Sequence, residues 1–311
     1  MAELLGIDTS NYTTSAAVLD TDTMTVRQSK KLLPVKKGEK GIRQSDAVFH
    51  HTKQLPEMIA AVSEGIKPAG IGVSVRPRLA EGSYMPCFLV GESAADMLGS
   101  VCGIKPDKTS HQIGHILAAL YSCGGLDMVR KGPFIAFHVS GGTTDMLLCT
   151  PDEDKLIDIT TVGCSLDLKA GQAIDRAGVM LGLDFPCGAQ LEALAAQSSE
   201  RFKVKAVLRG MDCSLSGIEN KCRDMLQKGV PSCDIARFCL DSVYAAVHGM
   251  TAAALKEYGA LPLVYAGGVM SDKYIADKLR ADFGGLFAAP EYSCDNAAGV
   301  AVYSAIMKGY I

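Results

Sequence analysis

Two histidines four residues apart provide the clearest chemical signal in the sequence. They are His111 and His115, in the segment HQIGH. Residues four apart share one face of an α-helix, so two imidazoles placed there could bind one metal ion. A zinc peptidase would need a glutamate as general base at the second position of this motif, and Gln112 cannot accept a proton. The spacing leaves two interpretations open: a metal site, or two histidines that share a helix face without a metal.

Asp295 is a second residue that could carry chemistry. It lies in the segment SCDN, immediately before an apolar stretch at 297–308 that predicts a final helix. An aspartate in that position either caps the helix or provides a carboxylate ligand to a metal ion. The residue types leave both roles open.

Turns made of small residues are typical of anion-binding sites, because backbone N–H groups can approach a phosphate there. One such turn lies in FIAFHVSGGTTDMLLCT, which begins at Phe134. The segment LLGIDTSNYTTSAAVLD near the start has the same order of strand, small polar turn and strand. The two segments therefore form an internal repeat and predict two lobes of similar topology. For either segment taken alone, an ordinary β-hairpin is the alternative.

A further glycine pair, Gly267-Gly268, separates an apolar strand at 261–266 from a predicted helix at 271–280. This order would let a nucleoside or a phosphate lie against the backbone. Two glycines before a helix are not specific by themselves.

The elements around these motifs predict layered α/β lobes. Apolar spacing predicts helices at 45–63, 91–98, 111–121, 170–181, 189–196 and 233–258, and strands at 71–75 and 286–288. Alternating strands and helices are typical of α/β architecture. With 311 residues, 48% of them hydrophobic, the chain is long enough for two domains that share a cleft.

Composition excludes several classes of protein. The start, MAELLGIDTS, lacks a basic region before an apolar segment, and no run approaches the roughly 18 apolar residues of a membrane span. We therefore expect a cytoplasmic enzyme that does not enter a membrane. The 11 cysteines contain no CxxC pair and fit neither a disulfide framework nor a structural zinc site, so we expect reduced, mostly buried thiols.

The net charge of −3 gives the whole chain no attraction for nucleic acid. Locally, one basic run holds a single acid, Glu39. It contains Arg27, Lys30, Lys31, Lys36, Lys37, Lys40 and Arg43. The run either contacts phosphates or is a solvated loop between two strands, and we favour the loop.

Six segments in order resemble motifs of one family. They are HQIGHILA, HVSGGTTD, AGQAIDRAGVMLGLDFPCG, CSLSGIENK, YAGGVMSDKYIADKLR and SCDNAAGVA. They resemble the tRNA threonylcarbamoyl-transferase family, formerly described as glycoproteases, over nearly the whole chain. The resemblance implies a two-lobed α/β fold of the actin-like and sugar-kinase (ribonuclease H-like) type, with a helical insertion in the second lobe. We expect a first lobe at 1–128, completed by a C-terminal helix at 296–311, and a second lobe at 129–295.

The resemblance also implies site residues. A metal ion, Fe²⁺ or Zn²⁺, would be bound by His111, His115 and Asp295, which would thereby be catalytic. His138 falls where some members place a tyrosine ligand and would be a fourth. The implied nucleotide-binding positions are Val139, Ser140, Gly141, Gly142, Thr143, Asp175, Gly188, Gly267, Gly268 and Asp272.

The implied reaction is transfer of a threonylcarbamoyl group from its adenylate to the adenosine beside the tRNA anticodon. The metal would orient the acyl group and polarise its carbonyl, and the glycine turns would hold the AMP leaving group. The implied partners are tRNA, a small paralogous protein and a separate enzyme that makes the adenylate.

Several positions depart from the family pattern. SNYTT at 10–14 replaces a turn with an acidic pair, S-C-D-E-T, and RPRL at 76–79 replaces a glycine-rich GPGL turn. Cys187 replaces the first glycine of PGG, and Asp272 replaces an asparagine. These changes indicate a divergent paralogue. The alternatives are a protein that binds nucleotide and metal but carbamoylates another acceptor or hydrolyses ATP, and a non-catalytic scaffold.

Overall fold

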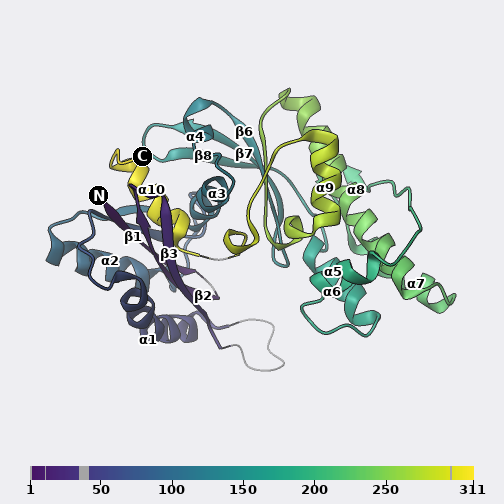
Figure 1. The fold of residues 1–311 in the computed structure, drawn as a ribbon, viewed down its shortest axis with the longest axis horizontal. Helices are drawn as coiled ribbons and strands as arrows, with labels where there is room; N and C mark the ends of the chain where they lie inside the picture. Colours follow the sequence, from purple (N-terminus) through teal and green to yellow (C-terminus); the bar gives the residue numbers. More distant parts are fainter. Residues whose placement is uncertain (1, 11, 35–41, 295) are drawn as a thin grey trace. The chain divides into compact units, whose positions relative to one another are not determined.

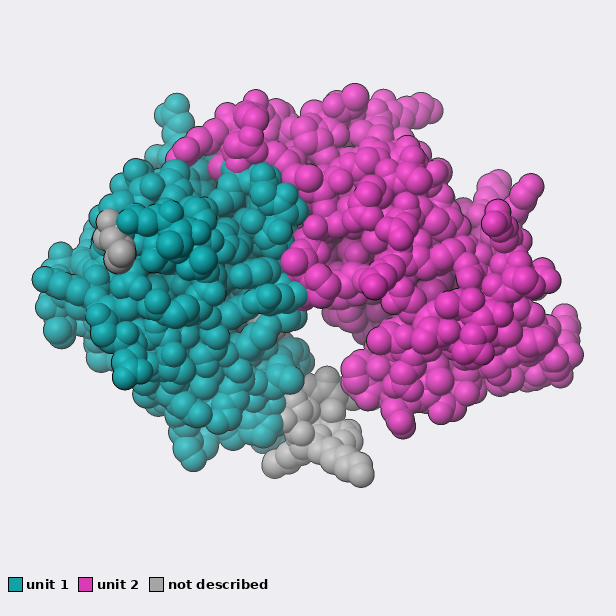
Figure 2. Space-filling view, viewed as in Figure 1, with its two compact units in different colours: residues 1–126, 152–157, 291–311 teal, residues 127–151, 158–290 magenta. Residues whose placement is uncertain are grey.

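Two compact units make up the computed structural model, which describes residues 2–10, 12–34, 42–294 and 296–311. The first unit comprises residues 1–126, 152–157 and 291–311, and the second comprises 127–151 and 158–290 (Figure 2). The C-terminal segment therefore belongs to the same unit as the N-terminus.

The first unit is built on a five-stranded sheet with the order β3-β2-β1-β4-β5. Its strands are β1 (Glu3–Ser10), β2 (Thr13–Asp20), β3 (Thr25–Leu32), β4 (Gly70–Arg76) and β5 (Asp107–Ser110). Its helices are α1 (Gln44–Ser63), α2 (Phe88–Cys102), α3 (His111–Ser122) and α10 (Ala298–Met307) (Figure 1). Strand β1 is antiparallel to β2 and parallel to β4.

Side chains alternate between the two faces of β1, and the helices divide accordingly. Leu5 and Ile7 belong to the apolar core that α1 and α2 cover. Gly6 points the other way, where a Cβ would meet the backbone of Ala297 and Ala301 at the start of α10. Helix α10 can therefore lie directly on the sheet because the strand has no side chain there.

The second unit repeats this arrangement with a sheet of order β12-β11-β6-β7-β8. Its strands are β6 (Phe134–Val139), β7 (Thr144–Asp152), β8 (Leu156–Cys164), β11 (Leu263–Ala266) and β12 (Leu286–Phe287). In both sheets a central strand lies between its hairpin partner and a parallel strand that arrives later in the chain. The two lobes of similar topology that the internal repeat predicted are thus confirmed.

Helices fill the long connection between β8 and β11. They are α5 (Ala170–Met180), α6 (Gly188–Ala195), α7 (Ser216–Gln227) and α8 (Ser232–Tyr258), with a short hairpin of β9 (Leu208–Arg209) and β10 (Asp212–Cys213). The 3₁₀ helix η1 (Gly268–Ser271) and helix α9 (Lys273–Phe283) follow β11. Short elements α4 (Met128–Lys131) and η2 (Pro290–Tyr292) complete the described chain.

Helix α8 is long and apolar enough to cross a membrane, but 61% of its most apolar window is buried inside the protein. Its inward residues, including Ile235, Val243 and Met250, belong to the core of the second unit. It is therefore the core helix of this unit. All 11 cysteines are free, and six of them are buried.

Several elements differ from the sequence-based expectations. Strands β5 and β8 were not predicted. Residues 25–32 form edge strand β3, not part of a loop, and residues 35–41 of the same basic run lie outside the described residues. Helix α7 was not predicted, although its buried apolar positions Ile218, Cys222 and Met225 have helical spacing.

Glycine contacts set the distance between α10 and α3, the helix that carries the histidine pair. A Cβ at Gly299 would lie 1.8 Å from the carbonyl oxygen of Gly114. The two helix backbones are therefore in direct contact, and no side chain fits between them.

We predict that Gly299→Ala destabilises the protein by about 1–3 kcal/mol or more, because the methyl group must push two helices apart. Gly217→Ala is the matched control. It is also the second residue of a helix, but a Cβ there meets nothing within 4 Å. Urea unfolding should show a lower midpoint for the first variant and an unchanged or higher one for the control. Equal midpoints would mean that α10 and α3 are not in backbone contact.

Candidate functional site

A buried carboxylate lies beside the histidine pair in the first unit. Asp8, at the end of β1, is completely buried, and its Oδ1 lies 3.1 Å from Nδ1 of His111. Ser10 and Ser74 also donate hydrogen bonds to this carboxylate. Burial by itself raises the pKa of Asp8, but the charge and hydrogen bond of His111 and the two serine hydroxyls hold it below the ordinary value. Asp8 is therefore an anion at neutral pH.

This contact determines which nitrogen of His111 carries a lone pair. An ionised carboxylate can only accept hydrogen bonds, so Nδ1 of His111 carries a proton and donates the hydrogen bond to Asp8. When the imidazole is neutral, Nε2 is then the atom able to ligate a metal. The rings of His111 and His115 have centroids 4.3 Å apart, so the structure brings the predicted pair together.

The local fold explains how these groups meet. Strands β4 and β5 pair in parallel, with a register shift between Ser74 and Arg76 that bends the strand end beside the cluster. Ser110, the last residue of β5, caps α3 by accepting a hydrogen bond from the Ile113 N–H at 3.2 Å. The chain thus turns directly from the sheet into the helix that presents His111.

A second histidine lies near Asp8 in a fixed tautomer. Gln54 donates from Nε2 to the carbonyl of Leu32, so its Oε1 faces the Thr14 hydroxyl, which donates to it at 2.8 Å. Thr14 therefore accepts from Nδ1 of His51, also at 2.8 Å. Burial lowers the pKa of His51 to about 4 in spite of the nearby Asp8 charge. His51 is a neutral imidazole, and its buried Nε2 has no hydrogen-bond partner among the described residues.

In the second unit, the Ser-Gly-Gly-Thr turn between β6 and β7 forms an open cradle. Ser140 Oγ accepts hydrogen bonds from the backbone N–H of Gly142 and of Thr143. Gly141 and Gly142 are exposed, and a Cβ on either would meet nothing within 4 Å. The space beside this turn is therefore open to a ligand.

The Gly267-Gly268 turn has a different requirement at each residue. Gly267 has φ +99°, and a Cβ there would lie 2.2 Å from the carbonyl oxygen of Val139 at the end of β6, so only glycine fits. Gly268 is exposed with open space around it. Gly171 completes the set, because its Cβ position lies 2.6 Å from the backbone nitrogen of Gly141. The structure thus brings the two predicted glycine turns together at the ends of β6 and β11.

The other predicted nucleotide positions have structural partners. Asp175 accepts a hydrogen bond from the Cys187 N–H at 2.9 Å, which ties α5 to the start of α6 beside Gly188. Asp272 caps α9 through the Ile275 N–H at 3.0 Å. Aspartate and asparagine cap helices about equally well, so the capping contact survives the departure from the family pattern.

The structure does not test two of the predicted metal ligands. Asp295 lies outside the described residues, and His138 lies on β6 in the second unit. Among the residues that the structure describes, no group of three or more His, Cys, Asp or Glu side chains is arranged to hold a metal ion. The roles of these residues stay predictions.

Sequence reasoning missed Asp8, Ser74 and His51. The available signal was Asp8 itself, a charged residue inside the apolar strand LLGID. Two described members of the basic run are paired with acids. Arg27 pairs with Glu3 at 2.8 Å and Lys31 with Glu57 at 3.0 Å.

A sequence model of the family described as tRNA N6-adenosine threonylcarbamoyltransferase matches residues 26–302. The enzyme of that name from Archaeoglobus fulgidus is 27% identical over 309 residues, covering 97% of this chain and 90% of the relative. The one from Thermosipho africanus is 29% identical over 325 residues, covering 98% and 95%.

Solved structures show the fold. Component A of (R)-2-hydroxyglutaryl-CoA dehydratase from Acidaminococcus fermentans has a TM-score of 0.57 at 16% identity, covering 100% of this chain and 99% of that one. A ROK-family glucokinase from Streptomyces griseus has a TM-score of 0.53 at 13% identity, covering 97% and 99%. The actin-like and sugar-kinase fold expected from the sequence is confirmed.

We predict a pH-dependent penalty at Asp272. Burial is the main cause that raises its pKa from 3.8 to about 6, and the Glu192 carboxylate adds to it. Because the folded-state pKa is the higher one, this group favours folding below pH 4, and that contribution is lost as pH rises through 6. Asp272→Asn should therefore stabilise the protein at pH 8 by up to about 3 kcal/mol and give no gain at pH 4.

Thermal unfolding at several pH values checks this prediction. Asp20→Asn is a control of opposite sign, because the backbone N–H groups of Thr23 and Asp22 lower the pKa of Asp20. That variant should lose stability at neutral pH and approach the wild type in acid. A pH-independent effect of Asp272→Asn would contradict the assignment.

Proposed function

Since the chain belongs to the tRNA N6-adenosine threonylcarbamoyltransferase family, we propose that the glycine turns of its second unit and the histidine pair of its first unit carry out threonylcarbamoyl transfer to an adenosine of tRNA. The observation that carries this proposal is the contact between Asp8 and His111. This contact orients the imidazole of His111 and leaves its Nε2 as the nitrogen that can bind a metal.

The glycine turns would hold the AMP part of the threonylcarbamoyl-adenylate. Gly141, Gly142 and Gly268 expose backbone with no side chain in the way, which a phosphate or nucleoside requires. Asp272 and Asp175 would face the nucleoside, where a ribose hydroxyl could donate to a carboxylate. Asp272 close to a phosphate would be repulsive, so the proposal places it toward the sugar.

The histidine pair fits a metal ion of the kind that the family implies. His111 and His115 would hold it, with Asp295 as the proposed third ligand and His138 as a proposed fourth. Imidazole and carboxylate donors suit Fe²⁺ and Zn²⁺ alike. Bound there, the metal would supply Lewis-acid polarisation of the acyl carbonyl.

The residues of the first unit have defined tasks in this scheme. Asp8 holds His111 in the Nδ1-protonated tautomer and stabilises any positive charge on the ring. Ser10 and Ser74 keep the Asp8 carboxylate from rotating. Because Asp8 is completely buried, it can neither contact the substrate nor exchange protons with water directly, so it is a positioning residue.

A second function is favoured by one specific observation. At the two positions of the acidic pair in the family motif, this chain has Tyr12 and Thr13, and neither side chain is a carboxylate. No carboxylate of that pair is available as a general base. The alternative function is therefore carbamoyl transfer to another acceptor, or ATP hydrolysis, at the same nucleotide and metal sites.

We place the protein in the cytoplasm with tRNA as acceptor, an adenylate-forming enzyme as supplier and a small paralogous protein as partner.

A candidate surface for this small paralogous partner lies on α1 and α2, where Phe49, Leu89, Met97 and Val101 are exposed apolar side chains. Exposed apolar side chains on neighbouring helices can contribute to an interaction surface.

The nucleotide part of the proposal predicts the behaviour of Gly268→Arg. The arginine side chain would fill the open space at the turn, so calorimetry should show binding of AMP or an ATP analogue weakened at least about tenfold. The thermal stability should not change, because no protein atom lies within 4 Å of the new Cβ. Gln227→Arg, on an exposed position of α7 in the same unit, should bind like the wild type. Unchanged affinity in Gly268→Arg would place the nucleotide elsewhere.

The catalytic part predicts loss of transfer in His111→Ala. Incubation of tRNA with the protein, its small paralogous partner and threonylcarbamoyl-adenylate should yield threonylcarbamoyladenosine, detected by mass spectrometry of tRNA nucleosides, and the variant should make none. Asp8→Asn should weaken Zn²⁺ or Co²⁺ binding by about 10–100-fold, as outer-shell partners of ligating histidines do. Asp241→Asn, at another buried carboxylate that contacts no histidine, should leave metal affinity unchanged. If His111→Ala and Asp8→Asn both bind metal as tightly as the wild type, the assignment is contradicted. If the wild type leaves tRNA unmodified, the alternative function is favoured.

A further inference from the structure

Four exposed cations follow one another in the segment 200–210 of the second unit. Arg201, Lys203, Lys205 and Arg209 are exposed, and none of them has an ion-pair partner among the described residues. Glu200 is the one acidic residue of the segment, so its net charge is +3 from four cations and one anion. Two cations of the earlier basic run, Arg27 and Lys31, differ because they are paired with acids.

Exposure alternates along this segment. The residues between the cations, Phe202, Val204 and Ala206, are partly buried, while Arg201, Lys203 and Lys205 are exposed. This period of two is that of an extended chain with one inward and one outward face. All three cations therefore point to the same side, away from the protein.

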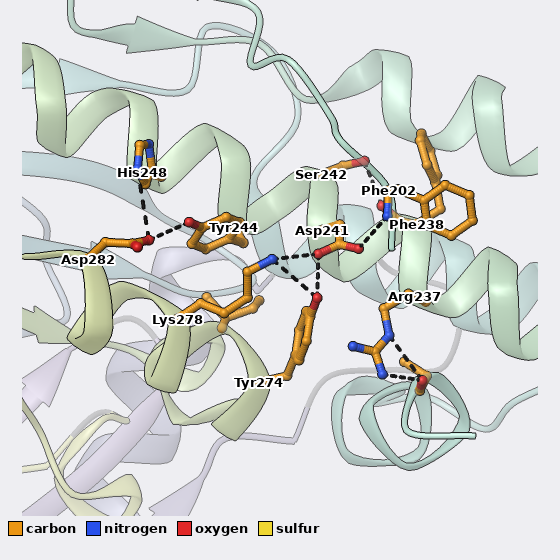
Figure 3. Close-up of polar contacts among 12 residues, drawn as sticks. Phe202, Arg237, Phe238, Asp241, Ser242, Tyr244, His248, Tyr274, Lys278 and Asp282 are labelled. Carbon is orange, nitrogen blue, oxygen red and sulfur yellow. Dashed lines mark hydrogen bonds and ion pairs between the residues drawn. The ribbon is translucent and has the colours of Figure 1, made fainter. Parts of the chain in front are cut away.

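The inward face is tightly held (Figure 3). The Phe202 N–H donates to Oδ2 of the buried Asp241 at 3.3 Å, and the Phe202 ring packs edge-on against Phe238 with centroids 5.6 Å apart. The other oxygen of Asp241 accepts from Lys278 at 2.8 Å and from the Tyr274 hydroxyl. These contacts fix the backbone of the segment, so the cationic side chains keep a regular spacing and their charges are not neutralised.

A second contact holds the other end of the segment. Ala206 and Leu208 lie against Gly249 on α8, where a Cβ would come within 2.8 Å of the Leu208 side chain. The Ser214 N–H donates to the carbonyl of Val207 at 3.0 Å. The segment is thus fixed at Phe202 and again at 206–208, with Lys203 and Lys205 displayed between the two anchors.

The spacing of the cations suits a polyanion. Alternate residues of an extended chain lie about 6.6 Å apart, so Arg201 to Lys205 span about 13 Å. A nucleic acid strand carries one negative charge about every 3.4 Å along its axis, so a strand lying along the segment offers several phosphates to three cations.

We propose that Arg201, Lys203 and Lys205, continued by Arg209, form a contact surface for the phosphate backbone of RNA. The proposal rests on the proposed function, in which the acceptor is a tRNA. Such contacts orient the RNA and carry no sequence information. The acceptor adenosine is then selected elsewhere on the protein.

The test is the salt dependence of tRNA binding by the triple variant Arg201→Gln, Lys203→Gln, Lys205→Gln. Loss of three phosphate contacts should flatten the log–log slope of affinity against salt by up to about 2 for a single strand or about 3 for a duplex. Binding at 0.1 M salt should weaken at least about tenfold, equally for tRNA and for an unrelated RNA. Phe202→Ala, which keeps every cation but removes the anchor, should give a smaller loss.

A matched triple variant controls for total charge. Arg27→Gln, Lys31→Gln, Lys131→Gln also changes the net charge from −3 to −6, but each of these cations is paired with an acid. It should keep the wild-type slope.

The surface is overturned if the first triple variant keeps the wild-type slope, if both triple variants flatten it equally, or if the wild type does not bind RNA at low salt. If the wild type binds RNA and the first triple variant binds it equally well, the contact surface is contradicted but the proposed function is not. Formation of threonylcarbamoyladenosine by the wild type decides separately whether the proposed function holds.

Discussion

A carboxylate without access to water must be compensated by its neighbours, and the first unit is arranged to do this for Asp8. The compensation comes from three separate elements: Ser10 on the same strand, Ser74 on β4 and His111 on α3. An unpaired buried charge would cost several kcal/mol, so displacement of any one element leaves a penalty that the others must absorb. The position of α3, and with it the orientation of the histidine pair, is therefore coupled to the order of strands β1, β4 and β5.

The second unit has the same topology but different residues at the strand ends. Its sheet repeats the strand order of the first, but at the corresponding strand end it has glycines where the first unit has polar side chains. Gly267 must be glycine because the Val139 carbonyl occupies the place of its side chain, whereas Gly141, Gly142 and Gly268 face open space. The strand ends of the first unit thus present polar side chains, and those of the second unit present exposed backbone groups.

Short-range features were predictable from the sequence. The His111–His115 spacing and the small-residue turns depend on residues close together in the chain, and the structure has them where they were expected. The contact of Asp8 with His111 joins residues 103 positions apart, so no local pattern could reveal it. Strand β3 was read as a loop because it is an edge strand rich in charged residues, a composition that protects an edge from pairing with other chains. The cations at 201–209 were visible in the sequence, but their common direction depends on anchors supplied by α8.

The C-terminal helix has a consequence for the order in which the protein is made. Helix α10 belongs to the first unit and lies with its backbone against Gly6 of β1 and Gly114 of α3. A ribosome completes residues 1–126 long before it reaches residue 298, so the first sheet waits with one face uncovered while the whole second unit is synthesised. Domains usually fold in the order in which they emerge, and here the order is reversed: the second unit is complete before the first can close. A nascent chain that stops short of α10 would leave the glycine face of β1 and β4 uncovered, and so the last ten helical residues decide whether the first hundred are stable.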